Sequence, residues 1–222
     1  MKNEEINIPL KSVVLIGNLS IPKNAKGIVV FSHGSGSGRL SSRNKLVAEM
    51  IQQHGFGTLL FDLLTEVEDR DYENRFDIDL LSSRLIETTD WLMENKDTKD
   101  FPIAYFGAST GAASAIRAAA YFGKKIKAVV SRGGRPDLAL NVLNLVTAPT
   151  LLIVGQRDTS VIEMNKKAFD LLVSEKEMKI IPGATHLFEE PGKLIEVAKL
   201  AILWYKKHLK YEINYLGAEP HL

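Results

Sequence analysis

The sequence predicts an α/β fold in which a mostly parallel, twisted sheet carries helices on both faces. Short apolar runs with the length of buried strands alternate with segments whose apolar residues recur at helical spacing. Strands and helices that alternate in this way form parallel sheets, because each helix returns the chain to the edge where the next strand begins. The chain has 222 residues, the size of one domain. We expect a single domain over 1–222, with a tail of unclear structure at about 211–222.

The apolar runs place eight strands along the chain. The first two form an opening pair that we expect to be antiparallel, and helical patterns separate most of the others. The expected strands cover residues 6–10, 12–16, 27–32, 57–63, 102–106, 127–131, 150–154 and 178–182.

Helical patterns fill the longer intervals. Ser41 or Ser42 can cap the helix after the third strand, and Pro191 suits the first position of the last long helix. Other helices are expected at about 78–93, directly after Ser109, and at 161–173. The interval 65–75 is dense in charged residues and predicts an exposed, solvated loop.

Composition narrows the classes of function. The 28 basic and 27 acidic residues give a net charge of +1, which favours neither nucleic acid nor an anionic membrane as a partner. The absence of cysteine excludes disulfides, a thiol nucleophile and cysteine-ligated metal. No apolar stretch approaches the length of a membrane span, and the polar start of the chain does not resemble a secretory signal. We expect a cytoplasmic protein.

A G-x-S-x-G pattern follows the fifth expected strand. Gly107-Ala108-Ser109-Thr110-Gly111 lies between an apolar run and an alanine-rich helical segment. Small residues at these positions allow a sharp strand-to-helix turn that exposes the serine hydroxyl. We interpret Ser109 as a catalytic nucleophile. The alternative is a capping serine at the start of a helix bounded by glycines.

A serine nucleophile needs a base that takes its proton. Of the five histidines, only His33 and His186 follow expected strands at the carboxyl edge of the sheet, where ligands bind in open α/β folds. His186 lies in the loop after the last strand and is the candidate base. His33 is interpreted as a structural residue that shapes the glycine loop behind it.

Two aspartates are candidates for the acid that orients this base. Asp158 follows the strand just before the one that leads to His186, and Asp137 follows the strand before that. We favour Asp158, because serine, acid and histidine then follow successive strands in the chain order of a known hydrolase arrangement. Asp137 stays open as the second candidate, and a helix N-cap is the other role for either aspartate.

A glycine loop follows the third strand, with the sequence His33-Gly34-Ser35-Gly36-Ser37-Gly38-Arg39. It matches neither the P-loop nor the dinucleotide-binding pattern, because Arg39 occupies a position where each needs glycine. It fits an oxyanion hole in which the backbone N–H groups of Thr110 and Ser35 are the donors, with Gly34 or Gly36 as alternatives to Ser35. The other interpretation is a flexible connection.

Four arginines fall near the same edge of the sheet: Arg39, Arg43, Arg132 and Arg135. They could recognise a carboxylate or phosphate of a substrate, or they could hold loops and pair with acidic side chains. Both interpretations stay open. The candidate substrate-binding residues are Gly34, Gly36, Arg39 and Arg132.

These motifs together resemble the α/β-hydrolase superfamily up to about Leu209, and most of all its dienelactone hydrolase-like branch. The residues that carry the resemblance are 33–38, 107–111, 131–137, Asp158 and 184–188. The resemblance implies the α/β-hydrolase fold. One departure matters: dienelactone hydrolases proper use a cysteine nucleophile, whereas this chain has Ser109 and no cysteine.

The interval 138–149 has room for one short helix and none for the helical cap that many lipases carry there. An open site suits small soluble substrates. We expect a serine hydrolase that cleaves a small carboxylic ester or thioester through an acyl-enzyme, with Ser109, His186 and Asp158 as its triad and without a metal or organic cofactor. The alternatives are an acylaminoacyl-type peptidase and a non-catalytic binding protein on a hydrolase scaffold. The tail after Leu209 could pair with a second subunit in a homodimer.

Overall fold

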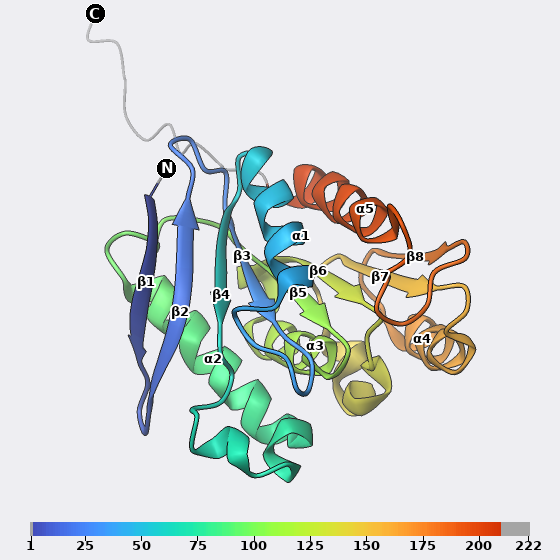
Figure 1. Cartoon of the computed structure of the whole chain (residues 1–222), viewed down its shortest axis with the longest axis horizontal. Helices are drawn as coiled ribbons and strands as arrows, with labels where there is room; N and C mark the ends of the chain where they lie inside the picture. The colour runs from blue at the N-terminus through green and yellow to red at the C-terminus, as the bar shows by residue number, and fades with distance from the viewer. Residues whose placement is uncertain (1, 210–222) are drawn as a thin grey trace, which may run out of the picture.

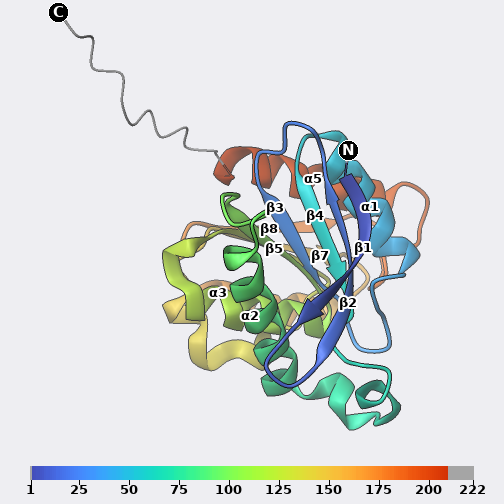
Figure 2. The ribbon, with the colours of Figure 1, turned by 90° about the vertical axis from the view of Figure 1, so that its left-hand side faces the viewer.

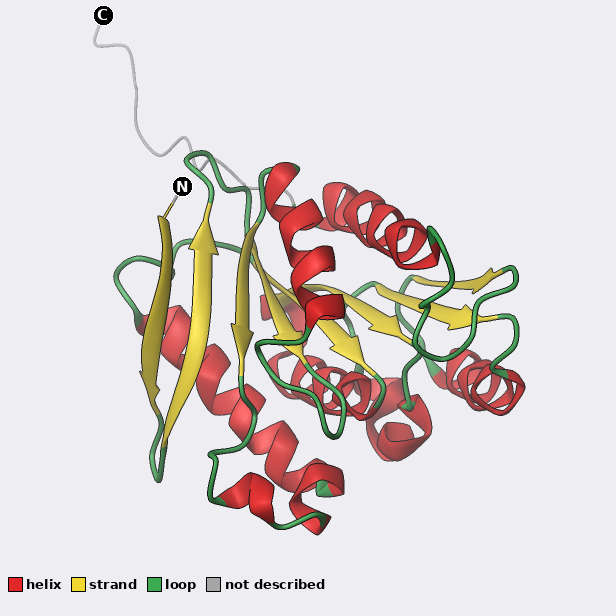
Figure 3. Ribbon diagram, viewed as in Figure 1, coloured by secondary structure: helices red, strands yellow, loops and turns green. Residues whose placement is uncertain are grey.

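The computed structural model describes residues 2–209 and shows one eight-stranded sheet with helices on both sides (Figure 1; Figure 3). The strands are β1 (Lys2–Pro9), β2 (Val14–Ile21), β3 (Ile28–Ser32), β4 (Gly57–Phe61), β5 (Ile103–Ala108), β6 (Ile126–Arg132), β7 (Thr150–Gly155) and β8 (Lys176–Ile181). The helices are α1 (Ser42–Gln53), α2 (Ile78–Glu94), α3 (Thr110–Phe122), α4 (Thr159–Leu171) and α5 (Lys193–His208). Short 3-10 helices are η1 (Glu68–Arg70), η2 (Glu73–Phe76), η3 (Gly123–Lys125) and η4 (Pro136–Leu145).

The strand order across the sheet is β1-β2-β4-β3-β5-β6-β7-β8. The two pairs β1–β2 and β2–β4 are antiparallel, and every other neighbouring pair is parallel. The expected fold class, a mostly parallel sheet with helices on both faces, is confirmed. The tail at 211–222 lies outside the described residues.

Two apolar layers bury the faces of the sheet. One layer packs β-strand side chains such as Val30 and Tyr105 against α2, α3 and α4, and the other packs their neighbours Phe31 and Phe106 against α1 and α5. Figure 2 shows the two helical layers on opposite sides of the sheet. Successive side chains of a strand point to opposite faces. The central strands are therefore apolar at nearly every position, as parallel strands buried on both faces are.

The ends of several elements differ from the sequence-based expectation. The opening strands are longer than expected, because β1 and β2 pair through their backbones from Lys2–Ile21 to Pro9–Val14 although the start of β1 is charged. The last helix begins at Lys193 and not at Pro191, since Gly192 at its N-cap has φ 79°. Ser41 is the N-cap of α1, and its hydroxyl accepts from the Asn44 N–H at 3.4 Å.

Only η4 stands between β6 and β7, and a kink at Ala139 interrupts it. The described part of the chain therefore has no cap domain at this point, as expected. Within residues 2–209, every helix is too short or too polar to span a membrane.

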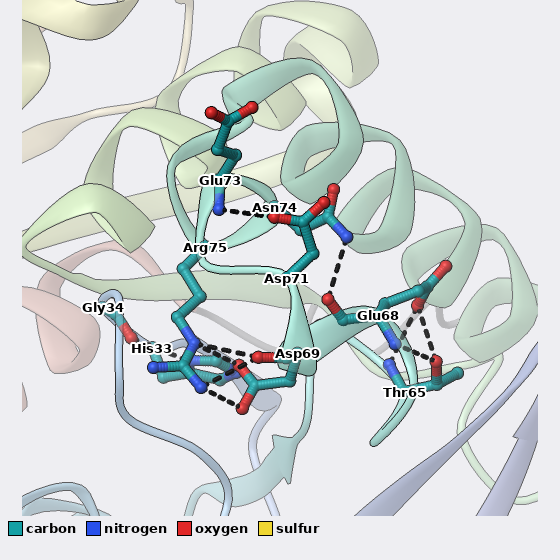
Figure 4. Close-up of polar contacts among 9 residues, drawn as sticks. All are labelled: His33, Gly34, Thr65, Glu68, Asp69, Asp71, Glu73, Asn74 and Arg75. Carbon is teal, nitrogen blue, oxygen red and sulfur yellow. Dashed lines mark hydrogen bonds and ion pairs between the residues drawn. The ribbon is translucent and has the colours of Figure 1, made fainter.

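The segment between β4 and α2 is more ordered than the solvated loop that its charge predicted (Figure 4). Arg75 makes two bonds to the Asp69 carboxylate, at 2.9 and 2.8 Å, and also donates to the Asp69 carbonyl. Glu68 accepts from the Thr65 N–H and hydroxyl and from Arg84 Nη2 at 2.6 Å. Two of the charges that suggested solvation thus pair within the segment, and Glu68 joins the segment to Arg84 of α2.

We expect Glu68→Gln to lower the free energy of unfolding by about 1.5–3 kcal/mol at neutral pH, since it weakens charge-assisted hydrogen bonds. Only 22% of the Glu68 side chain and 7% of the Arg84 side chain are exposed. Burial alone would raise the pKa of Glu68, but the hydrogen bonds from Thr65 and Arg84 outweigh it and hold the pKa below its usual value.

Because the folded-state pKa of Glu68 is depressed, its contribution is complete above the unfolded pKa and is lost as the pH falls through the folded value. Urea denaturation at several pH values should therefore show the full difference between wild type and Glu68→Gln at about pH 7, and the difference should shrink as the pH falls below the ordinary glutamate pKa of 4.5 and through the lower folded-state pKa. Glu73→Gln, an exposed change in the same segment, is the control. An equal loss in both variants at every pH would contradict this account.

Candidate active site

Ser109, Asp158 and His186 meet at the carboxyl edge of the sheet. Ser109 follows β5, Asp158 follows β7 and His186 follows β8. The His186 Nε2 lies 3.3 Å from Ser109 Oγ, and the His186 Nδ1 lies 2.6 Å from Asp158 Oδ2. Parallel strands end at one edge of a sheet, so residues far apart in the sequence come together there. The arrangement is a continuous hydrogen-bonded chain from hydroxyl to imidazole to carboxylate.

The backbone at Ser109 is strained. Its φ of 51° and ψ of −123° lie where residues with a side chain rarely occur. The turn is sharp because α3 begins directly against β3: a Cβ on Gly111 would lie 2.1 Å from the Ser32 carbonyl oxygen and 2.4 Å from that of His33. The glycine therefore allows the close contact that presents the serine hydroxyl at the end of the strand.

Hydrogen bonds from the neighbouring loop hold this turn. The Ser109 N–H donates to the Arg132 carbonyl at 3.2 Å, and the Arg135 N–H donates to the Ser109 carbonyl at 3.0 Å. The loop is fixed in turn by Asn165 of α4, whose side-chain amide donates to the Gly134 carbonyl at 3.0 Å. Sequence reasoning missed Asn165, because nothing in the sequence separates it from other polar residues of a helix.

We expect Asn165→Asp to cost about 3–5 kcal/mol of stability, because it leaves a buried carboxylate against acceptors. The Asn165 side chain is fully buried, and Nδ2 also donates to the Val161 carbonyl at 2.8 Å. A carboxylate there would face both carbonyl oxygens without a donor. Thermal or urea unfolding measures the effect, and Asn141→Asp at the exposed surface of η4 is the matched control. Equal stability of the two variants would refute the proposed role of Asn165.

Contacts on both sides of His186 hold the loop that carries it. Phe188 is 1% exposed and has a φ of 58°, so its ring is inserted below the loop at the cost of local strain. The Thr185 N–H donates to Glu190 Oε1 at 3.0 Å, and the Arg157 N–H donates to the Ala184 carbonyl at 2.9 Å. The His186 side chain itself is 37% exposed, whereas that of Asp158 is 12% exposed. The imidazole is thus accessible from solvent on a fixed support.

The structure brings Asp158, and not Asp137, to His186. Asp158 occupies the N-cap position of α4, yet its side chain makes no capping hydrogen bond and goes to the imidazole. Asp137 is held by Arg135, whose Nε and Nη2 donate to its two carboxylate oxygens at 2.9 and 2.8 Å. The Asp137 carboxylate therefore binds Arg135 and does not reach His186.

The glycine loop lies against Ser109. A Cβ on Gly34 would be 3.0 Å from Ser109 Cβ, so the loop backbone directly adjoins the candidate nucleophile. The expected oxyanion donor Ser35 has its N–H directed to Thr110 Oγ1 at 2.9 Å. The side chain of Thr110 was not expected to take part. It ties the loop to the start of α3, because its hydroxyl is the acceptor within reach of Ser35.

His33 has the structural role that the sequence suggested. Its Nε2 accepts from the Leu63 N–H at 3.0 Å, so Nδ1 carries the proton and donates to the Gly34 carbonyl at 3.0 Å. Burial lowers the pKa of His33, and the backbone bond to Gly34 and the charges of Asp62 and Asp69 oppose this only in part. A neutral imidazole thus joins the glycine loop to the end of β4.

The candidate substrate-binding arginines have different surroundings. Arg39 ion-pairs with Asp62 and Glu5 at 3.0 and 3.2 Å, and its Nη1 donates to Asn18 at 3.0 Å. These partners hold Arg39 against β1, β2 and the end of β4, which does not support a role in substrate binding. Arg132 is 7% exposed and lies beneath α1, where its Nη2 reaches Asn44 Oδ1 at 3.3 Å.

Comparison with known proteins identifies one family and several structures of the same fold. The profile of the Dienelactone hydrolase family matches residues 15–211. The crystal structure of a dienelactone hydrolase from Anabaena variabilis is 52% identical, covers 94% of this chain and 99% of its own, and superimposes with a TM-score of 0.93. Est1E from Butyrivibrio proteoclasticus shares the fold at 16% identity, with a TM-score of 0.79 over 91% of this chain and 98% of its own.

A relative from Mycobacterium tuberculosis, named "Putative phosphoribosyl transferase", is 53% identical over 209 residues. These cover 94% of this chain and 47% of the relative, so the chain spans about half the length of that protein. The family match extends over most of the sequence, from β2 to the end of α5. The chain therefore belongs to the dienelactone hydrolase family and has the α/β-hydrolase fold.

Proposed function

We propose that this chain is a serine hydrolase that cleaves a small carboxylic ester or thioester through an acyl-enzyme intermediate. The observation that carries the proposal is the hydrogen-bonded chain from Ser109 Oγ through His186 to Asp158 Oδ2. A hydroxyl next to a base that is itself oriented by a carboxylate is the arrangement that activates serine for attack on a carbonyl carbon.

The steps follow from the positions of these groups. Ser109 Oγ attacks the acyl carbon while His186 Nε2 takes its proton, and Asp158 holds Nδ1 and stabilises the imidazolium. The imidazolium then gives the proton to the departing alcohol or thiol, which leaves an ester on Ser109. A water molecule that loses a proton to His186 attacks this ester, and Ser109 regains its proton as the carboxylic acid is released.

Backbone donors would stabilise the negative oxygen that forms in both addition steps. The Thr110 N–H follows the nucleophile directly and is the first donor. The Ser35 N–H would join it by exchanging its Thr110 hydroxyl acceptor for the oxyanion. Loss of one such donor costs about 3–4 kcal/mol in the barrier.

The openness of the site supports small substrates. No cap stands between β6 and β7, and the His186 side chain is 37% exposed. The Mycobacterium tuberculosis relative is about twice as long as its matched part, so its name describes a protein with a further segment that this match does not cover. The triad geometry of this chain favours acyl transfer to water over transfer of a phosphoribosyl group.

The test is intact-mass spectrometry after exposure to a fluorophosphonate, with Ser109→Ala beside the wild type. A single adduct on the wild type that disappears in the variant is the expected result, because only an activated serine reacts. A folded wild type that takes no adduct would overturn the proposal and leave a binding protein on a hydrolase scaffold. The p-nitrophenyl ester and the p-nitroanilide of one acyl group are then compared as substrates. Cleavage of the ester alone indicates an esterase, and cleavage of the anilide as well indicates an acylaminoacyl-type peptidase.

A further inference from the structure

Thr110 carries two hydrogen-bond donors for which the described residues provide no acceptor. It is the first residue of α3 and is 3% exposed. Neither its N–H nor its hydroxyl proton has an acceptor within hydrogen-bonding distance among residues 2–209. A helix leaves its first N–H groups without partners, and a threonine hydroxyl in a helix donates to the preceding turn, whereas here β5 precedes. Buried donors are normally bonded, so both point to an acceptor on a ligand.

The oxygen of the same hydroxyl has a partner. Thr110 Oγ1 accepts from the Ser35 N–H at 2.9 Å, so one of its lone pairs is used and its proton is directed away from Ser35. A hydroxyl that accepts a hydrogen bond is polarised by it and donates a stronger one. The Thr110 O–H is therefore a prepared donor, and it lies beside the two backbone N–H groups of the expected oxyanion hole.

These donors adjoin the candidate nucleophile. Thr110 follows Ser109 in the chain, and a Cβ on Gly34, the residue before Ser35, would lie 3.0 Å from Ser109 Cβ. Ser35 and Ser109 are both partly exposed, so a substrate can enter between them. The first turn of α3 contains no acidic residue, and the partial positive charge of this helix end favours a negative oxygen. An acyl oxygen that becomes negative during attack by Ser109 is the acceptor that the donors of Thr110 lack.

We propose that the Thr110 hydroxyl is a third donor of the oxyanion hole and hence a catalytic side chain. The inference rests on the proposed hydrolase function and adds a side-chain donor to its two backbone donors. In the free protein, Thr110 Oγ1 accepts from the Ser35 N–H. When the acyl oxygen becomes negative, the Ser35 N–H turns to that oxygen and the Thr110 O–H donates to it. The proton stays on Oγ1 throughout, and no covalent bond of Thr110 changes.

Thr110→Val and Thr110→Ser test the hydroxyl, because valine keeps the shape of threonine without the hydroxyl and serine keeps the hydroxyl. On p-nitrophenyl acetate we expect Thr110→Val to lower kcat by about 10²-fold and to change KM by less than about threefold, since the donor acts in the transition state. Thr110→Ser should recover most of this loss. Thr159→Val, at the exposed first position of α4 directly after Asp158, is the matched control and should keep the wild-type kcat.

Two ketones separate binding of the oxyanion from ordinary binding, and both are measured by the protection of Ser109 from the fluorophosphonate. Trifluoromethyl ethyl ketone accepts Ser109 Oγ at its carbonyl carbon while His186 takes the proton, which leaves a negative oxygen on the adduct. Methyl ethyl ketone resists this addition and reports ground-state binding. In Thr110→Val, protection by the fluorinated ketone should need roughly 10²-fold more compound, and protection by the other ketone should not change. A variant that merely disturbs the pocket weakens both.

A double-mutant cycle with Ser35→Pro distinguishes direct donation from support of the Ser35 N–H, because proline removes that N–H. If Thr110 donates directly, Thr110→Val still lowers kcat by about tenfold or more in the Ser35→Pro background. An absence of any further loss there would overturn the assignment. If Ser35→Pro does not fold, proton NMR of the fluorinated-ketone adduct of the wild type decides. It should show a slowly exchanging hydroxyl proton next to the Thr110 methyl group, and its absence would contradict donation.

The outcomes separate this inference from the proposed function. If the wild type hydrolyses no ester and takes no fluorophosphonate, the proposed function itself fails. If the wild type is active and Thr110→Val keeps its kcat and its protection by the fluorinated ketone, the hydroxyl is not a donor, although the hydrolase function stands. A kcat that rises in Thr110→Val would show that the hydroxyl competes with the oxyanion for the Ser35 N–H, and this result would also overturn the inference.

Discussion

Asp158→Asn is expected to lower kcat about 10⁴-fold on a short p-nitrophenyl ester. The Asp158 Oδ2 lies 2.6 Å from His186 Nδ1, so it fixes the proton on Nδ1 and leaves Nε2 free to accept from Ser109. An amide can present its N–H₂ group to Nδ1 and select the opposite tautomer, in which Nε2 carries a proton and cannot act as a base. It also supplies no negative charge for the imidazolium.

Asp137→Asn is the matched control for this prediction. Asp137 binds Arg135 through both carboxylate oxygens, and this partly exposed pair makes no contact with the imidazole. We expect less than a tenfold change in kcat, since such pairs contribute about 0–1 kcal/mol. Steady-state kinetics with circular dichroism of each variant makes the comparison. A loss at Asp137 that equals the loss at Asp158 would show that the acid has been assigned to the wrong residue.

The choice between these two aspartates shows what sequence reasoning can and cannot decide. Both follow a strand at the carboxyl edge of the sheet, so chain order alone leaves both available. What separates them is a local contact: Arg135, two residues before Asp137, takes both oxygens of that carboxylate. Ser109 and His186 were easier, because one follows the G-x-S-x-G turn and the other is the histidine of the loop after the last strand.

The central strands were predictable for a physical reason. They are buried on both faces and read as unbroken apolar runs, as in β3 and β7. The edge strand β1 was underestimated, since its charged residues conceal the backbone pairing with β2. The exposure of the segment after β4 was predicted, but its 3-10 turns and its internal ion pair were missed for a related reason. A dense set of charges does not reveal that its members, such as Arg75 and Asp69, bind one another.

The sequence did not predict which side chains accept hydrogen bonds or which charged side chains lack a partner of opposite charge. The pattern of glycines predicted that the loop of Ser35 lies next to Ser109. It did not predict that the Thr110 hydroxyl accepts from the Ser35 N–H. The four arginines near the edge were equivalent in the sequence. The structure gives Arg39 and Arg135 carboxylate partners and leaves Arg132 without one. That difference arises from burial and packing, which depend on contacts between distant elements.

Gly111→Ala is expected to destabilise the fold at the turn that carries Ser109. Alanine within a helix normally stabilises by about 1 kcal/mol relative to glycine. Here the sign should reverse, because the new Cβ would lie 2.1 Å from the Ser32 carbonyl oxygen and 2.4 Å from that of His33. Both atoms belong to backbone that cannot move without shifting β3 or α3. We expect a net cost of at least about 3 kcal/mol from this overpacking.

Gly192→Ala is the matched control for this glycine. Gly192 has a φ of 79° and nothing within 4 Å of a Cβ, so alanine there would meet only the left-handed backbone penalty of about 1–2 kcal/mol. Urea denaturation gives the free energy of unfolding for both variants, and fluorophosphonate labelling reports whether the elbow survives in the fraction that folds. If Gly111→Ala is as stable as the wild type, α3 does not need its close contact with β3, and the strained conformation of Ser109 must have another cause. If it is destabilised and also unlabelled, the packing of this helix on the strand is what presents the nucleophile.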